Sequence, residues 1–68
     1  MSKWNYVFVN DPDDNFNIVI DIEFDNKYCA TIKKVDEELV LCWYSSPKDH
    51  LIPVNWLHKI LDEAQQKL

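Results

Sequence analysis

An alternation of apolar residues with mostly polar ones over residues 16–25 limits the possible folds of this chain more than any other feature. The segment reads FNIVIDIEFD, and each of its even-numbered residues is Phe or Ile. Successive side chains of a strand point to opposite faces of a sheet, so a period of two predicts a strand with one buried face. We therefore expect a sheet that is covered on one side.

Three further segments are predicted to be strands, at residues 4–9, 28–32 and 39–44. Each distributes β-branched, aromatic and other apolar residues over two alternating faces. Short connections separate the four segments. Consecutive strands joined in this way most simply form an antiparallel meander in the order 1-2-3-4.

The spacing of the apolar residues also predicts how the second and third strands pair. Placing Phe24 opposite Tyr28 on one face requires a loop with an odd number of residues. We therefore expect a three-residue loop at 25–27 rather than a two-residue turn. Asn26 or Lys27 is expected to take the left-handed conformation in this loop.

The third and fourth strands are expected to pair with Cys29 opposite Cys42. This register also places Lys33 opposite Glu38, and the resulting charge pair supports it. Two cysteines are too few for a disulfide-rich secreted scaffold, so both thiols are expected to be reduced. Because the N-terminus has no signal-peptide pattern and no segment approaches ~18 apolar residues, we expect a cytoplasmic protein outside the membrane.

The apolar pattern changes its period near the C-terminus. Apolar residues follow the three-and-four spacing of one helical face at Trp56, Leu57, Ile60, Leu61, Ala64 and Leu68. Pro53 suits the first turn of this helix, and Ser46 with Asp49 is expected to cap an earlier single turn. The helix is expected to pack on the sheet against Ile20, Ile22, Phe24, Ala30, Ile32, Leu41 and Trp43.

Residues 1–68 are therefore predicted to form one small α+β domain, a four-stranded antiparallel meander sheet with one C-terminal helix packed on one face. A chain of this length buries only ~60% of its unfolded surface, so a deep catalytic cleft is not expected. The absence of glycine excludes phosphate-cradling loops, nucleophile elbows and dinucleotide fingerprints. We expect a binding protein without a cofactor rather than an enzyme.

The segment NDPDDNFN, residues 10–17, resembles a calcium-binding loop only at its start. Asp11, Asp13 and Asn15 match the first, third and fifth positions of an EF-hand loop. Phe16 and Ile22 occupy the positions that require glycine and a bidentate glutamate, so the calcium interpretation fails. The segment is expected to be a connection between strands that carries more negative charge than a turn requires.

A zinc site is also not expected. The four candidate ligands are Cys29, Cys42, His50 and His58, and no two of them form the closely spaced pair that is typical of structural zinc sites. His50 is expected on a surface loop, and His58 at the boundary of the apolar helix face.

The charge of the chain favours a basic protein as partner. Twelve acidic residues stand against seven lysines, no arginine is present, and the formal net charge is −5. Phosphate backbones would be repelled, and the arginine side chain that most often contacts phosphates and guanine is absent, so direct binding of nucleic acid is not expected. Nine of the acidic residues lie between positions 11 and 38, so the sheet is expected to be the negative pole.

The face of the sheet turned away from the helix is the predicted interface. It combines an apolar centre with acidic neighbours, which is the composition of many protein interfaces, although scattered apolar residues on a small sheet are an equally good interpretation. The residues expected to bind the partner are Asp11, Asp13, Asp14, Asp21, Glu23, Val40, Cys42 and Tyr44.

These features predict a small acidic protein-binding module. An inhibitor or immunity-type protein that occupies a basic surface of its partner is the function class that they favour most. The alternative is a homodimer, larger homo-oligomer or complex subunit that uses the outer sheet face for assembly. A small enzyme or a nucleic-acid binder is the third interpretation.

Overall fold

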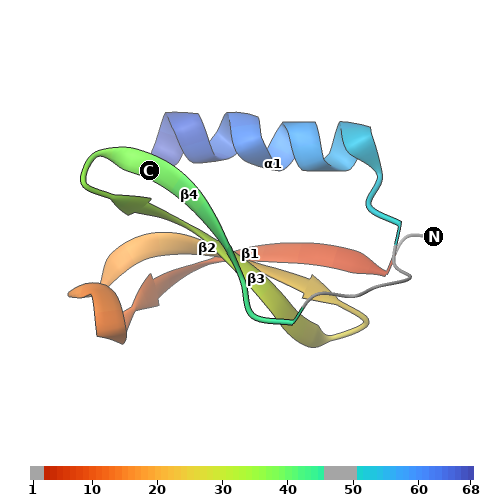
Figure 1. Cartoon of the computed structure of the whole chain (residues 1–68), viewed down its shortest axis with the longest axis horizontal. Helices are drawn as coiled ribbons and strands as arrows, with labels where there is room; N and C mark the ends of the chain where they lie inside the picture. Colours follow the sequence, from red (N-terminus) through yellow and green to blue (C-terminus); the bar gives the residue numbers. More distant parts are fainter. Residues whose placement is uncertain (1–2, 46–50) are drawn as a thin grey trace.

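A computed structural model describes residues 3–45 and 51–68 and confirms the predicted α+β architecture. Four strands form one antiparallel sheet in the order β1-β2-β3-β4, and one helix follows them (Figure 1). The elements are β1 Trp4–Asp11, a short 3-10 helix η1 Pro12–Asp14, β2 Asn17–Phe24, β3 Lys27–Val35, β4 Glu38–Trp43 and α1 Val54–Lys67. The predictions made for Ser46, Asp49 and His50 lie outside the described residues.

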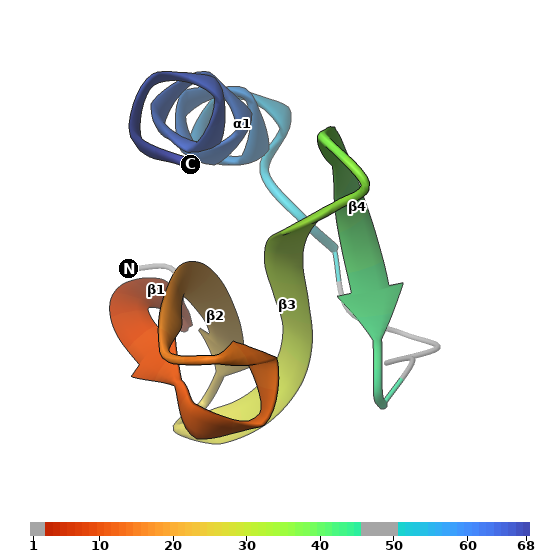
Figure 2. The same cartoon turned by 90° about the vertical axis from the view of Figure 1, so that its left-hand side faces the viewer.

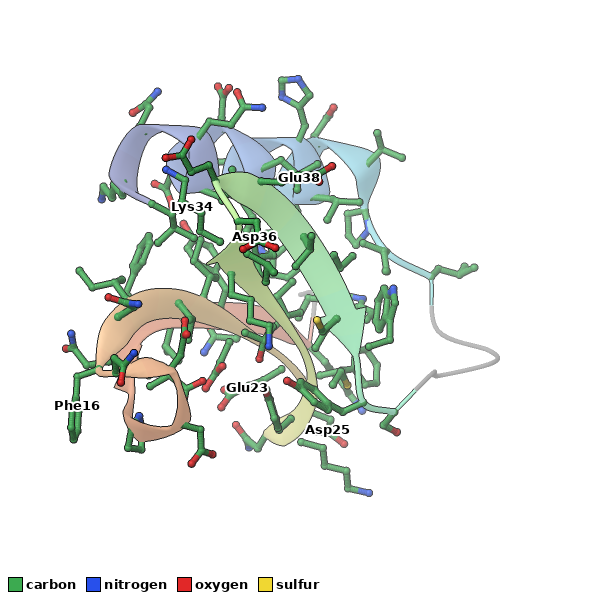
Figure 3. All side chains as sticks on the ribbon, turned by 60° about the vertical axis from the view of Figure 1, so that its left-hand side comes forward. Phe16, Glu23, Asp25, Lys34, Asp36 and Glu38 are labelled. Carbon is green, nitrogen blue, oxygen red and sulfur yellow. The ribbon has the colours of Figure 1, made fainter. Side chains whose placement is uncertain are left out.

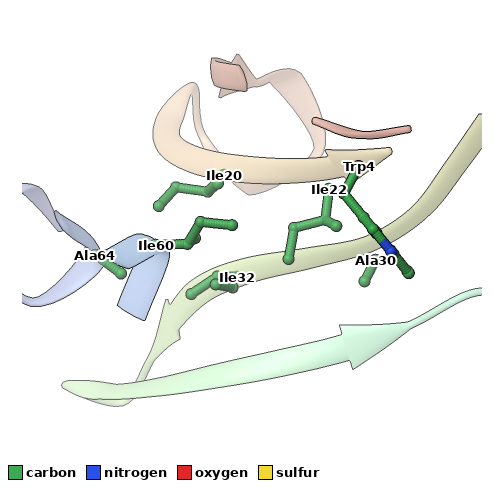
Figure 4. Packing of buried hydrophobic residues seen from close by; sticks show 7 residues of the cluster. All are labelled: Trp4, Ile20, Ile22, Ala30, Ile32, Ile60 and Ala64. Carbon is green, nitrogen blue, oxygen red and sulfur yellow. The ribbon is translucent and has the colours of Figure 1, made fainter. Parts of the chain in front are cut away.

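The helix packs on the sheet face that carries the even-numbered residues of β2. Seven buried side chains form the core between the two layers: Trp4, Ile20, Ile22, Ala30, Ile32, Ile60 and Ala64 (Figure 4). Ile60 is fully buried, as predicted. Trp4, which was not included in the predicted core, lies 4.8 Å from Phe24 and 5.7 Å from Trp56 between ring centroids.

Polar contacts attach the helix mainly to the β1 side of the sheet. The Tyr6 hydroxyl lies 2.7 Å from a Glu63 carboxylate oxygen and donates to it, and the Lys67 ammonium lies 4.9 Å from the centre of the Phe8 ring. The Trp4 indole N–H donates to the Leu51 carbonyl at 2.9 Å. In Figure 2, α1 lies above the side of the sheet that β1 and β2 form.

The prediction that Leu41, Trp43 and Leu61 belong to the core is therefore wrong. These three side chains are 37%, 44% and 42% exposed. The reason is that the helix is narrower than the sheet. Neighbouring strands lie ~4.8 Å apart, whereas one helix with its side chains is ~10 Å across. A single helix cannot cover four strands. On β4, Leu39 still packs against the core, whereas Leu41 and Trp43 are left exposed.

The loop between β2 and β3 also differs from the prediction. Asp25 and Asn26 form a two-residue turn with φ of 53° and 65°, and Phe24 pairs with Lys27. A β-bulge at Cys29 adds the residue that the loop lacks, so Ile22 still pairs with Ala30.

The register between β3 and β4 is shifted by two residues from the predicted one. Cys42 pairs with Thr31 instead of Cys29, and Glu38 pairs with Val35 instead of Lys33. The cause is the tight turn at residues 36–37, which closes the hairpin with two residues where the predicted register needs four. A shift of two leaves every side chain on its predicted face, because strands have a period of two.

Candidate functional site

The β1–β2 connection satisfies its own main-chain groups. Asp11 caps η1, because its carboxylate accepts from the Asp13 N–H at 3.0 Å, and Asn15 ends it in the left-handed conformation. The Phe16 N–H donates to the Asp11 carbonyl at 2.7 Å, and the Asn10 side chain donates to the Phe16 carbonyl at 2.9 Å. One aspartate is thus sufficient for this turn, as the sequence predicts.

Two more aspartates of this connection have no such structural role. In the described part of the chain, no hydrogen bond or ion pair engages the carboxylates of Asp13 and Asp14. No group of three or more His, Cys, Asp or Glu side chains that could hold a metal ion is found among the described residues. Phe16 points away from the body of the protein and is 66% exposed (Figure 3).

A groove of about 470 Å³ lies on the outer side of the sheet, next to this connection. It is lined by Val9, Asn10, Asp11, Pro12, Asp13, Val19, Asp21, Tyr28 and Tyr44. Residues from β1, the connection, β2, β3 and the end of β4 therefore meet at one place. We call this feature the tyrosine groove, because Tyr28 and Tyr44 form its aromatic wall.

The two tyrosines of the groove are in contact. Their ring centroids lie 5.1 Å apart with an interplanar angle of 34°. Tyr28 reaches this position because of the Cys29 bulge, which moves its side chain from the helix face to the outer face, opposite Glu23. The alternating pattern of the sequence predicts Tyr28 on the helix face, so Tyr28 is not among the predicted interface residues.

A chain of hydrogen bonds links Tyr28 to Asp21. The buried Thr31 hydroxyl lies 3.0 Å from an Asp21 carboxylate oxygen and donates to it. A threonine hydroxyl has a single proton, so the Tyr28 hydroxyl donates to Thr31. Burial of the hydroxyl is the largest cause that raises the pKa of Tyr28 to about 12, and the neighbouring Tyr44 and the negative charge of Asp21 also raise it. Tyr28 is therefore neutral at physiological pH, and Asp21 is held in one orientation.

The structure brings four of the eight predicted interface residues together. Asp11, Asp13, Asp21 and Tyr44 all line the tyrosine groove. Asp14 lies apart from them, in a second cavity of about 500 Å³ that is also lined by Lys34.

The other three predicted residues lie beside the groove rather than in it. Val40 and Cys42 are half-buried on the outer face of β4, and Glu23 is half-buried on β2. Cys29 does not join an exposed apolar centre, because it is buried in the bulge, and its thiol contacts the Lys27 carbonyl at 3.4 Å. Both cysteines are free.

Comparisons with known proteins add nothing to this geometry. No protein-family model matches the chain, and no significant match was found among curated proteins or solved structures. Among the described residues, no helix has the length and apolar character needed to cross a membrane.

Proposed function

We propose that this protein binds a basic region of a partner protein through the tyrosine groove. The observation that supports this proposal is that three aspartates, Asp11, Asp13 and Asp21, line the same groove as the contacting pair Tyr28 and Tyr44. Carboxylates accept charge-assisted hydrogen bonds from lysine and arginine, and tyrosine rings attract the same cations through their faces. The groove thus offers both kinds of contact to one cationic side chain.

The groove residues divide into two roles. Asp13 is exposed, and its carboxylate makes no hydrogen bond or ion pair with the described residues, so its charge is suited to steering a basic partner during association. Asp21 is half-buried and oriented by Thr31, so a cation paired with it would be desolvated and slow to leave. Tyr44, which is 59% exposed, would be the aromatic anchor.

An inhibitor or immunity-type protein is the function class that fits these roles best. Such a protein occupies a basic surface, for example that of a nuclease or of another nucleic-acid-binding protein. The net charge of −5 supports this class, because it favours encounter with a basic partner and repels phosphate backbones. Assembly through the outer face, either as a homo-oligomer or as a complex subunit, is the alternative that the following experiment separates from inhibition.

The test is binding kinetics at two ionic strengths with the protein that co-purifies from the native host. The double variant Asp11→Asn/Asp13→Asn removes two charges from the groove and keeps the cap, since asparagine caps helices as well as aspartate does. The matched control is Asp36→Asn/Glu37→Gln, which removes two charges from the β3–β4 turn, near the C-terminal end of α1 (Figure 3).

We expect the groove variant to lower the association rate at low salt by about tenfold and the control to lower it much less, because steering depends on the position of the charge. Tyr44→Ala is expected mainly to raise the dissociation rate. Equal association rates for the groove variant and the control would contradict the proposal. An oligomer of this chain alone that Tyr44→Ala dissociates would favour assembly through the outer face instead.

A further inference from the structure

The strand β4 is an edge strand, and its own sequence offers no protection against pairing within the described residues. It is last in the strand order, and the segment 39–44, LVLCWY, contains no charged residue, proline or glycine. Soluble proteins normally protect such an edge with charges, prolines, bulges or a covering element. On the opposite edge strand, β1, charged side chains of α1 contact the residues of the helix face, since Glu63 bonds to Tyr6 and Lys67 lies over Phe8.

The main-chain groups of β4 are directed for a further strand. The Tyr44 N–H donates to the Cys29 carbonyl at 2.8 Å, toward β3. Because main-chain groups of an antiparallel strand alternate in direction, those of Leu39, Leu41 and Trp43 point away from β3. The side chains of the same three residues lie on the helix side of the sheet, where α1 leaves them half-buried or exposed.

We propose that β4 pairs antiparallel with β4 of a second copy of this chain, with Leu41 on the two-fold axis. In this register Leu41 faces Leu41 of the second copy, and Leu39 faces Trp43. These pairs exchange six main-chain hydrogen bonds. On the outer face, Val40 lies opposite Cys42 of the second copy. The two sheets become one continuous sheet, and the tyrosine grooves stay open.

Self-complementarity identifies the occupant as a second copy. A two-fold interface requires one patch to match itself, and the five residues from Leu39 to Trp43 pair only with one another when Leu41 is central. A shift of two residues toward the N-terminus would bring Glu37 opposite Trp43 and would lose apolar pairs. The uncharged stretch therefore selects the register.

The charges flanking β4 agree with antiparallel pairing. Glu38 would face Tyr44 of the second copy, so the two Glu38 residues would be six strand positions, or ~20 Å, apart. This separation exceeds the Debye length of ~8 Å at physiological salt, and the acidic ends would not repel strongly. Parallel pairing would instead place the two glutamates side by side. The charge pattern thus excludes the parallel arrangement.

The first test is the mass of the protein in solution, measured by light scattering across a dilution series. We expect the native chain to show twice its monomer mass of 8.1 kDa. Leu41→Lys places two positive charges at the axis and is expected to restore the monomer mass. The matched control is Val7→Lys on β1, because Val7 is also 37% exposed on an edge strand, and this variant is expected to stay dimeric.

The second test defines the register without a charged substitution. Val40→Cys places a thiol opposite Cys42 of the second copy, so mild oxidation should give a covalent dimer whose peptides link position 40 to position 42. Circular dichroism shows whether each variant is folded. The proposal is overturned if the native chain stays monomeric at all concentrations. It is also overturned if Val7→Lys dissociates while Leu41→Lys stays dimeric, or if Val40→Cys does not form a disulfide between two copies.

Discussion

At the scale of single residues, the fold makes unusual demands on a chain without glycine. Six described residues have positive φ, in three turns: Asn15, Phe16, Asp25, Asn26, Asp36 and Glu37. Asparagine and aspartate tolerate this region because their short side chains bond locally, whereas other residues pay a cost of ~1–2 kcal/mol. Phe16 and Glu37 therefore carry conformational strain that glycine would remove.

Replacing Glu37, which has φ of 68°, by glycine should stabilise the protein. Relief of the left-handed cost exceeds the added entropy of glycine in the unfolded chain, so we expect the free energy of unfolding to rise by about 0.5–1 kcal/mol. Asp-Gly is also a favoured sequence for this type of turn. Urea denaturation with an unchanged m-value would measure the gain.

Two controls separate conformation from charge in this experiment. Glu37→Gln removes the charge and keeps the strain, so it should leave stability nearly unchanged. Asn26→Gly alters the equivalent turn position where asparagine already tolerates φ of 65°, so its gain should be below ~0.5 kcal/mol. Equal gains at both turns would show that the residue type does not matter there.

Tyr28 predicts a loss of stability at high pH. Its pKa is raised from 10.0 to about 12, first by burial. Below pH 10, Tyr28 is protonated in both the folded and the unfolded protein, and its contribution to the free energy of unfolding is complete. Above pH 10, Tyr28 ionises first in the unfolded chain. The free energy of unfolding should therefore fall between about pH 10 and 12. Urea denaturation across this range measures the fall, and Tyr28→Phe should reduce it.

Part of this loss should persist in the Tyr28→Phe variant. The hydrogen bond to Glu63, burial and the charge of Glu63 also raise the pKa of Tyr6, so Tyr6 contributes in the same direction. A pH dependence that Tyr28→Phe leaves entirely unchanged would mean that the hydroxyl of Tyr28 is not in the hydrogen-bonded environment of the groove.

At the scale of elements, the position of the helix decides which apolar residues form the core. The sequence places Ile60 and Leu61 equally on the apolar face of the helix, yet Ile60 is fully buried and Leu61 is 42% exposed. The difference arises because α1 lies toward β1 and leaves its other flank facing the uncovered side of β4. We therefore expect Ile60 to contribute much more than Leu61 to the free energy of unfolding.

Substituting these neighbours tests the helix placement. Ile60→Ala should cost ~2–5 kcal/mol, as other large-to-small changes in a packed core do. Leu61→Ala should cost about 1 kcal/mol or less, because much of its side chain is already in contact with water. Chemical denaturation of both variants measures the difference. Similar losses would show that the helix covers β4 more fully, in agreement with the prediction from the sequence.

At the scale of the whole molecule, the charges contribute little to holding the fold together. Among the described residues one ion pair is formed, between Lys3 and Asp25 at 4.0 Å, and both side chains are more than half exposed. Such pairs contribute ~0–1 kcal/mol. The acidic residues of the groove are thus available for a partner, and pairing through β4 would present two grooves on one continuous sheet.

Sequence periodicity was sufficient to predict the four strands, their antiparallel order, the C-terminal helix and the side of the sheet that it covers. These features follow from the periods of two and of about 3.6, which local residues carry. The sequence also predicted eight interface residues. Four of them, Asp11, Asp13, Asp21 and Tyr44, line the tyrosine groove, and their role in binding stays a prediction.

Only the tertiary structure decided the register of β4, the bulge at Cys29 and the reach of the helix. A shift of two residues preserves every face, so an alternating pattern cannot distinguish the two registers of β4. A bulge reverses the alternation of side chains between the two faces at one point. For that reason the sequence pattern did not predict that Tyr28 lines the groove. The exposure of Leu41 and Trp43 depends on where one narrow helix rests on four strands, which no local pattern encodes.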